Sequence, residues 1–369
     1  MPGLLWVDLT DFRCFSHLKV AFEPSGMTVL EGPNGSGKSA ILEAVSWLSL
    51  QRSFRGAPRE SLVRRGMDRA LLRASYLAGD REIDLSAEIR PTRSSLSVRG
   101  KRIRTKSEVT SFLRVTTFSP ADLDLVQGPP AGRRELLDDL LLLEAPSVEL
   151  QLRQLERSTR QRNAFLKQVR GSLRHEDHVT LDVWDTRLAI AGEQVVAARE
   201  SLARRLGELS AESYARMTRS SSRTRLVELA YRRSWEGELF ESLQASRGRD
   251  LLQQSTSVGP HRDEMNIFLR GMMARTHASQ GEQRSIALAL RLASHSVAGQ
   301  ASGRPPILIL DDVFSELDEH RTEALIEQLP PGQALVSTAN SIPAKLEPFM
   351  AAQIQVPLLI EQVPRAGGQ

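Results

Sequence analysis

The chain has 369 residues, enough for two structural regions, and its 40% hydrophobic and 25% charged residues are typical of a globular protein with a sizeable core. The sequence has no apolar run as long as a membrane span, and its one cysteine excludes an intrachain disulfide framework and a multi-cysteine zinc site. The N-terminal residues lack the pattern of a signal peptide, so we do not expect one. We therefore expect a cytoplasmic protein without a membrane partner.

The net charge of +4 is unevenly distributed. Residues 52–106 carry fifteen Arg and Lys against six Asp and Glu, residues 151–233 carry seventeen against ten, and residues 301–369 carry four against nine. A basic stretch that faces one way is typical of a surface that binds nucleic acid, although a solvated basic face without a partner has the same composition. Within the first stretch, Arg64 and Arg65 are the candidates for contacts with DNA phosphates.

The N-terminal third is expected to be mainly β-structure around one helix. That helix begins at Ser39 and has apolar residues at 41, 42, 45 and 48, which is helical spacing. A basic loop over 51–73 follows it. The predicted strands are 4–9, 18–22, 27–31, 71–77, 83–89, 95–99 and 113–118.

The middle of the chain is predicted to be helical. A helix begins at 119, breaks at the Gly- and Pro-rich residues 128–132 and resumes over 133–143. Apolar residues at 181, 188, 195, 202 and 209 repeat every seven positions, which indicates a coiled-coil seam on a helix over 181–215, roughly 50 Å long. A weaker apolar stripe lies between 148 and 173, and a turn over 171–180 would make the two helices an antiparallel hairpin. A compact helical subdomain is the alternative.

The C-terminal part returns to alternating strands and helices. The apolar run 306–311 is typical of a parallel strand buried on both faces. Pro357 marks the last predicted strand as an edge strand. The predicted strands are 225–231, 265–270, 306–311, 334–337 and 353–360, and the predicted helices are 279–298 and 316–328.

Residues 32–39 match the phosphate-binding P-loop pattern G-x-x-x-x-G-K-[ST] between a predicted strand and a predicted helix, a context that a chance glycine-rich turn would not require. Lys38 is expected to reach the β- and γ-phosphates and Ser39 to bind Mg²⁺, so ATP and Mg²⁺ are the expected cofactors. The predicted ATP-binding residues are Gly32, Pro33, Asn34, Gly35, Ser36, Gly37, Lys38 and Ser39.

A second acidic motif follows the buried strand at 306–311. In this Walker B pattern, Asp311 is expected to hold Mg²⁺ and Asp312 to polarise an attacking water. Asp312 and Lys38 are therefore the predicted catalytic residues, and Ser39 and Asp311 the predicted metal ligands. The alternative is a strand that merely ends in acidic residues.

Ser279, Gln280, Gly281 and Glu282 lie at the start of an apolar helix. A helix N-terminus binds anions through its free N–H groups and its dipole. Ser279 and Glu282 also satisfy S-x-x-E, so a helix-capping box is the alternative.

The order of P-loop, signature at 279–282, Walker B and a D-loop-like stretch, Ser315, Glu316, Leu317 and Asp318, resembles the ABC-type ATPase heads of SMC-like proteins. Within that class the chain resembles the RecF family of bacterial recombination mediators. Further matching stretches are 12–13, 42–45, 118–122, 133–134 with Asp138, and 259–263. The resemblance implies an α/β fold: an ABC-type ATPase head, a P-loop NTPase with mixed sheets, over 1–118 and 255–369, and an inserted helical, coiled-coil-like arm over 119–254.

The resemblance also implies a function. A RecF-like protein is expected to bind double-stranded DNA and gapped or single-strand/double-strand junction DNA in an ATP-dependent way, in repair, recombination, replication and the SOS response. Its expected partners are RecR and RecO, with which it helps to load RecA. The signature residues are expected to face the γ-phosphate of the opposite subunit of an ATP-dependent homodimer, in which a weak, DNA-stimulated ATPase uses ATP as a switch.

Three positions depart from the general ABC pattern. Asp312 stands where transporter ATPases carry glutamate, which predicts slow turnover. Thr338 occupies the place of a switch histidine and is assigned as a γ-phosphate sensor. The Q-loop residue stays unassigned, because Pro120 is closer to the expected position than Gln127.

His261 and Arg262 have two interpretations: they fix the junction where the arm re-enters the head, or they take part in catalysis or DNA contact. For the whole chain, two rival functions stay open, a transporter ATPase subunit and an SMC-like structural dimer without DNA preference. Binding to membranes would favour the first rival, and equal binding to gapped, blunt and single-stranded DNA would favour the second.

Overall fold

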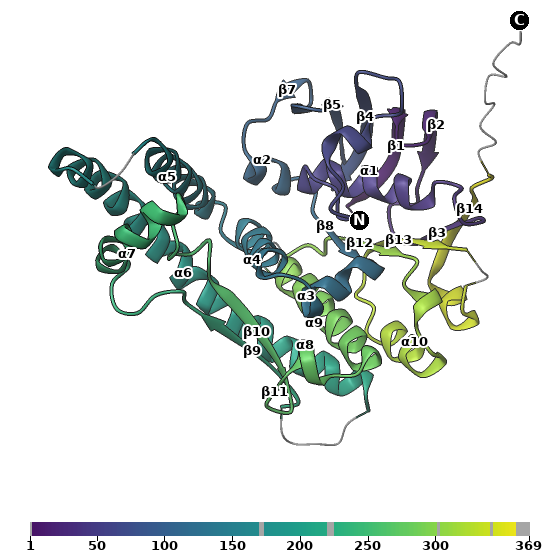
Figure 1. Ribbon diagram of the computed structural model, residues 1–369. Coiled ribbons are helices and arrows are strands. Elements are labelled where there is room, and N and C mark those ends of the chain that lie inside the picture. Colours follow the sequence, from purple (N-terminus) through teal and green to yellow (C-terminus); the bar gives the residue numbers. More distant parts are fainter. Residues whose placement is uncertain (1, 170–172, 220–224, 301–302, 340–341, 359–369) are drawn as a thin grey trace, which may run out of the picture. The chain divides into compact units, whose positions relative to one another are not determined.

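The computed structural model describes residues 2–169, 173–219, 225–300, 303–339 and 342–358 (Figure 1). These residues form two compact units, one within Met1–Ala121 and Pro305–Gln369 and the other within Asp122–Arg304. The second unit therefore contains residues 255–304 as well as most of the predicted arm. The functional division into 1–118, 119–254 and 255–369 stays a prediction.

The first unit contains a six-stranded antiparallel sheet in the order β2-β1-β4-β5-β6-β7. Its long strands alternate buried and exposed residues, because one face covers the core and the other faces solvent. All seven strands predicted for the first 118 residues are confirmed, five of them in this sheet and most of these slightly longer than expected, whereas the short β7 was not predicted. The strands are β1 (Gly3–Phe12), β2 (Phe15–Ala21), β4 (Ala70–Ala78), β5 (Arg81–Ile89), β6 (Ser94–Val98) and β7 (Lys101–Arg102), with the remaining predicted ones in the second sheet.

The same unit contains a five-stranded parallel sheet in the order β14-β3-β13-β12-β8. All five residues of β12 are buried, as its apolar sequence predicts. The last strand lies at an edge as expected, but it ends at Gln355, before Pro357, and residues 359–360 of the prediction lie outside the described chain. The strands are β3 (Gly26–Glu31), β8 (Val115–Phe118), β12 (Ile307–Asp311), β13 (Gln333–Thr338) and β14 (Met350–Gln355).

Helix α1 (Lys38–Leu50) packs between the two sheets of the first unit (Figure 1). Its buried residues, with Trp47 fully buried, share one hydrophobic core with strands of both sheets. This core fixes the helix start, and therefore the P-loop, relative to the ends of β3 and β12. Four shorter elements complete the unit: η1 (Arg59–Leu62), α2 (Lys106–Thr110), η3 (Phe314–Glu316) and η4 (Ala344–Phe349).

Helix α10 (Glu319–Ile326) is shorter than the helix predicted over 316–328. The Asp318 side chain accepts a hydrogen bond of 2.8 Å from the Arg321 N–H and caps the helix at its start. The residues before it form the separate turn η3.

The second unit combines helices with a three-stranded antiparallel sheet in the order β11-β10-β9. The sheet strands are β9 (Val227–Arg232), β10 (Glu264–Leu269) and β11 (Met272–Met273). The helices are α3 (Asp124–Gln127), α4 (Pro130–Glu144), α5 (Val148–Gln168), α6 (His175–Met217), α7 (Leu239–Gln253), α8 (Ala274–His277) and α9 (Gln280–Gln300), and the turn η2 (Pro120–Leu123) leads into them. Helix α7, with its apolar residues interrupted by charges, was not predicted.

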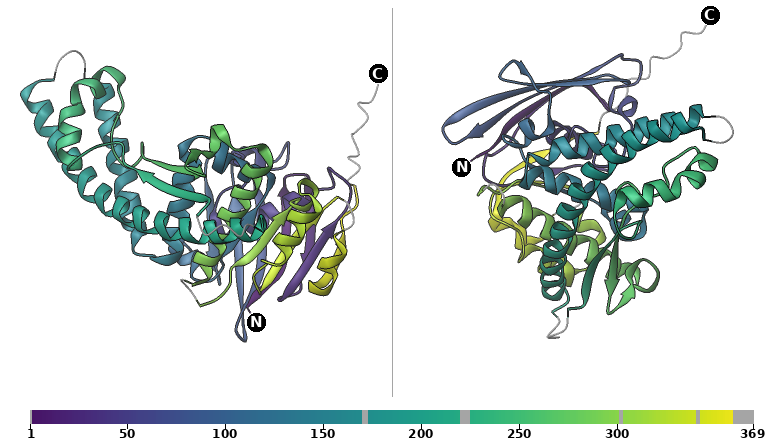
Figure 2. Two further views of the ribbon diagram at one scale, coloured as in Figure 1. Left: turned by 90° about the horizontal axis from the view of Figure 1, so that it is seen from below. Right: turned by 90° about the vertical axis from the view of Figure 1, so that its left-hand side faces the viewer.

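Helices α5 and α6 run antiparallel and side by side (Figure 2), as the hairpin prediction requires. Helix α6 has 43 residues, about 65 Å at 1.5 Å per residue. It begins at His175, so the turn predicted over 171–180 is wrong from 175 onward, and residues 171–172 lie outside the described chain. The Arg174 N–H donates to the Asp177 carboxylate at 2.8 Å in a capping box, which explains the early start.

Four of the five heptad positions of α6, Leu181, Leu188, Val195 and Leu202, are fully inaccessible, whereas Leu209 is half-buried. They pack against α5 and also against other elements, because α6 contacts α4, α7, β9 and α9. The seam is therefore confirmed, and within this unit it forms part of a compact core. Among the described residues, no helix is both long enough and apolar enough to cross a bilayer.

Candidate nucleotide-binding site

Two positions of the loop between β3 and α1 require glycine, Gly37 because of its backbone and the space around it and Gly32 because of space alone. Gly37 has φ +97°, and a Cβ atom there would lie 2.5 Å from Phe15 Cζ and 2.9 Å from Cys14 Sγ. A Cβ atom at Gly32 would lie 2.2 Å from the carbonyl oxygen of Val356. The loop is therefore held between the start of β2 and the end of β14, with its N–H groups at the start of α1.

Lys38 is largely buried at the first position of α1. Its Nζ donates to the carbonyl oxygens of Gly32 at 2.6 Å and Pro33 at 2.9 Å, both within the loop. Burial lowers the pKa of Lys38, and the negative charges of Asp312 and Asp311 oppose that shift. The structure therefore brings the predicted P-loop lysine and both Walker B acids together.

Asp311 lies buried at the end of β12, which is separated from β3 by β13. Its Oδ1 accepts a hydrogen bond of 2.7 Å from the Ser337 hydroxyl of β13. Burial raises the pKa of Asp311, while hydrogen bonds from Ser337 and Ser39 oppose the rise. The contact with Ser39 joins the two predicted metal ligands.

Asp312 follows with a left-handed backbone, φ +53°. Its N–H donates to the Ser337 hydroxyl at 3.0 Å, which orients the residue at the strand end. Among the described atoms, Asp312 Oδ1 and Ser36 Oγ are buried without a hydrogen-bond partner. Buried polar atoms of this kind are normally satisfied, so both fit a polar ligand at this place.

A cavity of about 740 Å³ lies over the loop, a size suited to a nucleotide. Its lining has an excess of positive charge, as a polyphosphate requires. The lining residues are Arg13, Cys14, Asn34, Gly35, Gly37, Lys38, Ser39, Ala40, Arg55, Glu60, Ser61, Val63, Arg65, Asp312 and Ser337.

Sequence analysis missed Arg13 and Arg55 as members of this site. The charge of Arg55 lowers the pKa of Asp311, so its guanidinium lies near the Walker B carboxylate. Arg13 precedes the P-loop, and only its place in the matching stretch 12–13 singled it out. For Arg55, the signal that could have found it is the placement of a basic segment directly after the P-loop helix. Which of its arginines turn toward the cavity depends on tertiary contacts.

The oxygen atoms of the Ser39 and Asp311 side chains fit a magnesium ion that is shared with a nucleotide. In the described part of the chain, no group of three or more His, Cys, Asp or Glu side chains could hold a metal ion unaided. Ser39 and Asp311 offer two oxygen ligands, and Mg²⁺ usually completes its shell with phosphate oxygens and water. Ser39 and Asp311 would therefore hold the ion, and a bound ion would supply charge neutralisation for phosphoryl transfer.

The signature residues lie in the second unit at the start of α9, with Ser279 and Gln280 exposed and Gly281 and Glu282 half-buried. The Ser279 N–H and hydroxyl donate to the Glu282 carboxylate at 2.9 and 3.0 Å, and the Glu282 N–H returns a bond of 3.3 Å to the Ser279 hydroxyl. The backbone bond from Ser279, followed by its hydroxyl and by Arg270, lowers the pKa of Glu282. The capping-box alternative is thus present, while Gln280 and Gly281 complete the helix start.

The other motif residues have local partners. The Ser315 hydroxyl donates to the Asp312 carbonyl at 2.8 Å, Leu317 leads into the Asp318 cap, and the Glu316 side chain lies outside the described atoms. The Gly32 N–H donates to the Thr338 carbonyl at 3.3 Å, so Thr338 adjoins the P-loop through its backbone. In the second unit, the Gln127 amide donates to the Gln283 side chain on α9.

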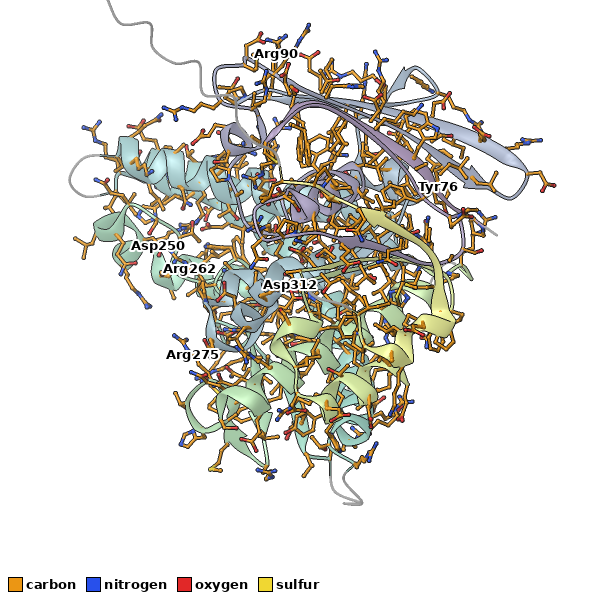
Figure 3. All side chains as sticks on the ribbon, turned by 90° about the vertical axis from the view of Figure 1, so that its right-hand side faces the viewer. Tyr76, Arg90, Asp250, Arg262, Arg275 and Asp312 are labelled. Atoms are coloured by element: carbon orange, nitrogen blue, oxygen red, sulfur yellow. The ribbon has the colours of Figure 1, made fainter. Side chains whose placement is uncertain are left out.

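The remaining candidates divide between surface and structural roles. Arg65 lines the nucleotide cavity, whereas Arg64 pairs with Asp11 at 2.8 Å and is half-buried. In the second unit, the side chains of His261 and Arg262 each contact the Thr256 carbonyl, at 3.0 and 3.1 Å (Arg262 is labelled in Figure 3). Burial lowers the pKa of His261 to about 4, which fits the structural interpretation of this loop.

The family model, the relatives and the solved structures that this chain resembles agree with one another. Residues 4–341 match the family model described as RecF/RecN/SMC N terminal domain. The "DNA replication and repair protein RecF" of Acidothermus cellulolyticus is 37% identical over 347 residues, which cover 90% of this chain and 92% of the relative.

Two solved structures of the recombination mediator protein RecF of the RecFOR pathway share the fold. The first, RecF-ATPrS, is 26% identical with a TM-score of 0.83 and covers 96% of this chain and 98% of its own. The second, RecF-ATP, is 27% identical with a TM-score of 0.83 and covers 92% of each chain.

Proposed function

The chain belongs to the RecF family, and from this premise we propose that it is an ATP-dependent DNA-binding protein of replication and recombinational repair. The observation that carries the proposal is that Lys38 lies near Asp311 and Asp312, at a cavity of nucleotide size that Lys38 and Asp312 line. An enzyme that hydrolyses ATP needs a cation for the phosphates, a metal-binding carboxylate and a group that orients water, and these three side chains meet those needs.

In this proposal the P-loop residues bind the phosphates of ATP. Lys38 would exchange its two carbonyl partners, Gly32 and Pro33, for phosphate oxygens, since an ammonium has three donors on a rotatable stem. Asp312 would orient water through its buried Oδ1. Aspartate is one methylene shorter than the glutamate of transporter ATPases, so turnover would be slow, and ATP would act as a switch.

We propose double-stranded and gapped or junction DNA as the macromolecular ligand, with Arg64 and Arg65 among the phosphate contacts. The support is the excess of nine positive charges over residues 52–106 and the family's name as a replication and repair protein. By the same family argument, RecR is a partner, with RecO and RecA in the same pathway, and the protein acts in the cytoplasm as an ATP-dependent homodimer with Thr338 as sensor.

The nucleotide part is tested with Lys38→Met. We expect a loss of ATP affinity of at least about a hundredfold, or about 2.7 kcal/mol, measured by calorimetry. Wild-type affinity in the variant would refute the assignment of the site.

The DNA part is tested by binding to gapped, blunt and single-stranded DNA, with ATP, with ADP and without nucleotide, over a series of salt concentrations. Phosphate contacts predict a linear fall of log affinity with log salt, with a smaller slope after reversal of Arg64 and Arg65 to Glu. Equal affinity for all DNA forms under all nucleotide conditions would favour a structural ATPase without DNA preference. Binding to membrane fractions would favour a transporter subunit.

A further inference from the structure

Glu43 is a charged residue that is completely buried in the middle of α1, one turn beyond the P-loop. A buried carboxylate is costly unless it is paired and hydrogen-bonded. Arg13 meets this need with two bonds, from Nε to Oε2 at 2.7 Å and from NH2 to Oε1 at 2.6 Å. The Ser53 hydroxyl also donates to Oε1.

These bonds attach Glu43 to both ends, Ser53 and Ser61, of the first part of the basic segment, which we define as residues 53–65. At one end, Ser53 Oγ also accepts from the Arg55 N–H at 3.1 Å. At the other end, Arg13 NH1 donates to the Ser61 carbonyl at 2.9 Å. One carboxylate therefore sets the position of Arg55 through Ser53 and that of Ser61 through Arg13.

The segment and the β1–β2 turn are joined further along by backbone bonds. The Arg13 N–H donates to the Leu62 carbonyl and the Arg64 N–H to the Asp11 carbonyl, both at 2.8 Å. The same turn carries Cys14 and Phe15, which lie against Gly37 of the P-loop. Movement of the basic segment therefore acts on the nucleotide cavity from two sides, through α1 and through the turn.

We infer that the clasp formed by Glu43, Arg13 and Ser61 couples the basic segment to the nucleotide cavity, so that DNA bound at Arg64 and Arg65 changes the affinity for ATP. The inference rests on the proposed DNA contact and adds a positioning role for Glu43. The segment that carries Arg64 and Arg65 also supplies Arg55 to the cavity, and Glu43 fixes the distance between them. By linkage, ATP changes DNA affinity by the same factor.

Two variants loosen the clasp in different ways. Glu43→Gln keeps the size of the side chain and one acceptor but removes the charge. Arg13→Lys keeps the charge but cannot reach Glu43 and Ser61 together, because a single ammonium replaces the planar fork. Arg59→Lys is the matched control, since Arg59 lies in the same segment and donates to the Thr92 carbonyl outside the clasp.

The experiment measures the dissociation constant of a fluorescent ATP analogue for the full chain, with and without a saturating short DNA duplex. We expect the duplex to change this constant at least about fivefold in wild type and Arg59→Lys, and less than about twofold in both clasp variants. Thermal unfolding checks that each variant is folded. In ATPase assays the clasp variants lose the DNA dependence of KM, an effect that a loss of folded protein would not produce.

The outcomes separate the inference from the function on which it rests. If both clasp variants keep the wild-type factor, the inference is refuted and the proposed function stands. If wild type binds DNA and ATP without any mutual effect, the ATP dependence in the proposed function fails together with the inference. If wild type does not bind DNA, the proposed function fails together with the inference.

Discussion

The Ser337 hydroxyl donates to Asp311 Oδ1 at 2.7 Å and accepts from the Asp312 N–H at 3.0 Å. One side chain of β13 therefore orients both acidic residues at the end of β12. Because β13 lies between β3 and β12, this residue also stands between the P-loop strand and the Walker B strand. An arrangement fixed before the ligand arrives lowers the cost of binding it.

Replacing Ser337 with alanine is expected to weaken magnesium-dependent nucleotide binding at low pH. The hydroxyl bond lowers the pKa of Asp311 against the effect of burial, so its loss raises that pKa further. Mg²⁺ binds the ionised carboxylate and competes with the proton, so the pH at which binding is half-maximal moves upward. Titrations between about pH 5 and 8 would measure this shift. Ser315→Ala, which removes a bond to the Asp312 carbonyl instead, is the control, and profiles that coincide would contradict the role of Ser337.

Asp312→Asn is expected to separate ATP binding from hydrolysis. The amide keeps the shape and the N–H contact with Ser337, but it lacks the charge that draws a proton from water. We expect ATP affinity within a few-fold of wild type, turnover lower by about a hundredfold or more, and a longer-lived DNA complex with ATP. Stopped-flow binding measures the ATP affinity, and single-turnover assays measure the hydrolysis rate. A wild-type hydrolysis rate in the variant would mean that another residue polarises the water.

Arg162 is expected to be essential for the stability of the second unit. Fully buried on α5, it donates to Asp185 of α6 and to Asp250 of α7, both at 2.6 Å (Asp250 is labelled in Figure 3). Arg162→Met would leave buried carboxylates without that cation, at a cost of roughly 3–5 kcal/mol in unfolding free energy. The exposed pair Arg160 with Glu156, also on α5, provides the control, where Arg160→Met is expected to cost less than about 1 kcal/mol. Equal losses in urea unfolding for the two variants would contradict the proposed role.

Local patterns were sufficient for the nucleotide site because each motif is contiguous and lies at the end of its own element. Lys38 and Ser39 follow β3, and Asp311 ends β12, so parallel strands bring them to one edge of the sheet. Ser337 could not be predicted in the same way. Its role depends on β13 lying between the two motif strands, and strand order is a tertiary property.

In the helical arm, the sequence predicted the helices but not their tertiary contacts. The heptad residues of α6 correctly predicted a long helix with a largely buried seam, but not that α6 also packs against α4, α7, β9 and α9. Arg162 resembles an ordinary surface arginine in the sequence, since nothing near it reveals Asp250, 88 residues away. Arg13 likewise acquires its partner, Glu43, only when the β1–β2 turn reaches α1.

Stability is expected to fall in acid because two histidines are buried. Burial lowers the pKa of His295 on α9 and of His261 to about 4, from an ordinary value of 6.5. The unfolded chain takes up these protons as the pH falls from 6.5, so the full stability is present above pH 6.5 and is lost progressively toward pH 4. Each residue accounts for roughly 3 kcal/mol over that range.

His295→Leu is expected to reduce this loss by about half relative to wild type, because one of the two protonations is removed. The exposed His277 near α9 serves as the control, since His277→Leu should leave the acid dependence unchanged. Urea unfolding at several pH values supplies the measurement. An acid dependence in His295→Leu equal to that of wild type would show that this histidine does not titrate as its burial implies.

The final prediction concerns assembly. The chain has one P-loop, at 32–39, and one signature, at 279–282, and the signature forms an exposed helix start with a serine hydroxyl. If the signature binds the γ-phosphate held by a second copy, ATP bridges two subunits in two shared sites, and ADP cannot. Dimerisation is then an equilibrium that shifts only by the difference in affinity of ATP for the closed and open states.

Ser279→Arg tests this arrangement directly. The capping bonds between Ser279 and Glu282 lie within one exposed turn, so their loss costs the fold about 1 kcal/mol, whereas the larger side chain blocks approach to a second subunit. We expect near-normal ATP binding by the monomer, no ATP-induced dimer and loss of most ATP-dependent DNA binding. Ser279→Ala is the control for the cap, since it removes the hydroxyl without adding bulk and is expected to weaken dimerisation only partly. Sedimentation with ATP, with ADP and without nucleotide measures the mass of the particle. A wild-type mass that is equal under all three conditions would refute the shared-site arrangement. So would a Ser279→Arg protein that still dimerises with ATP.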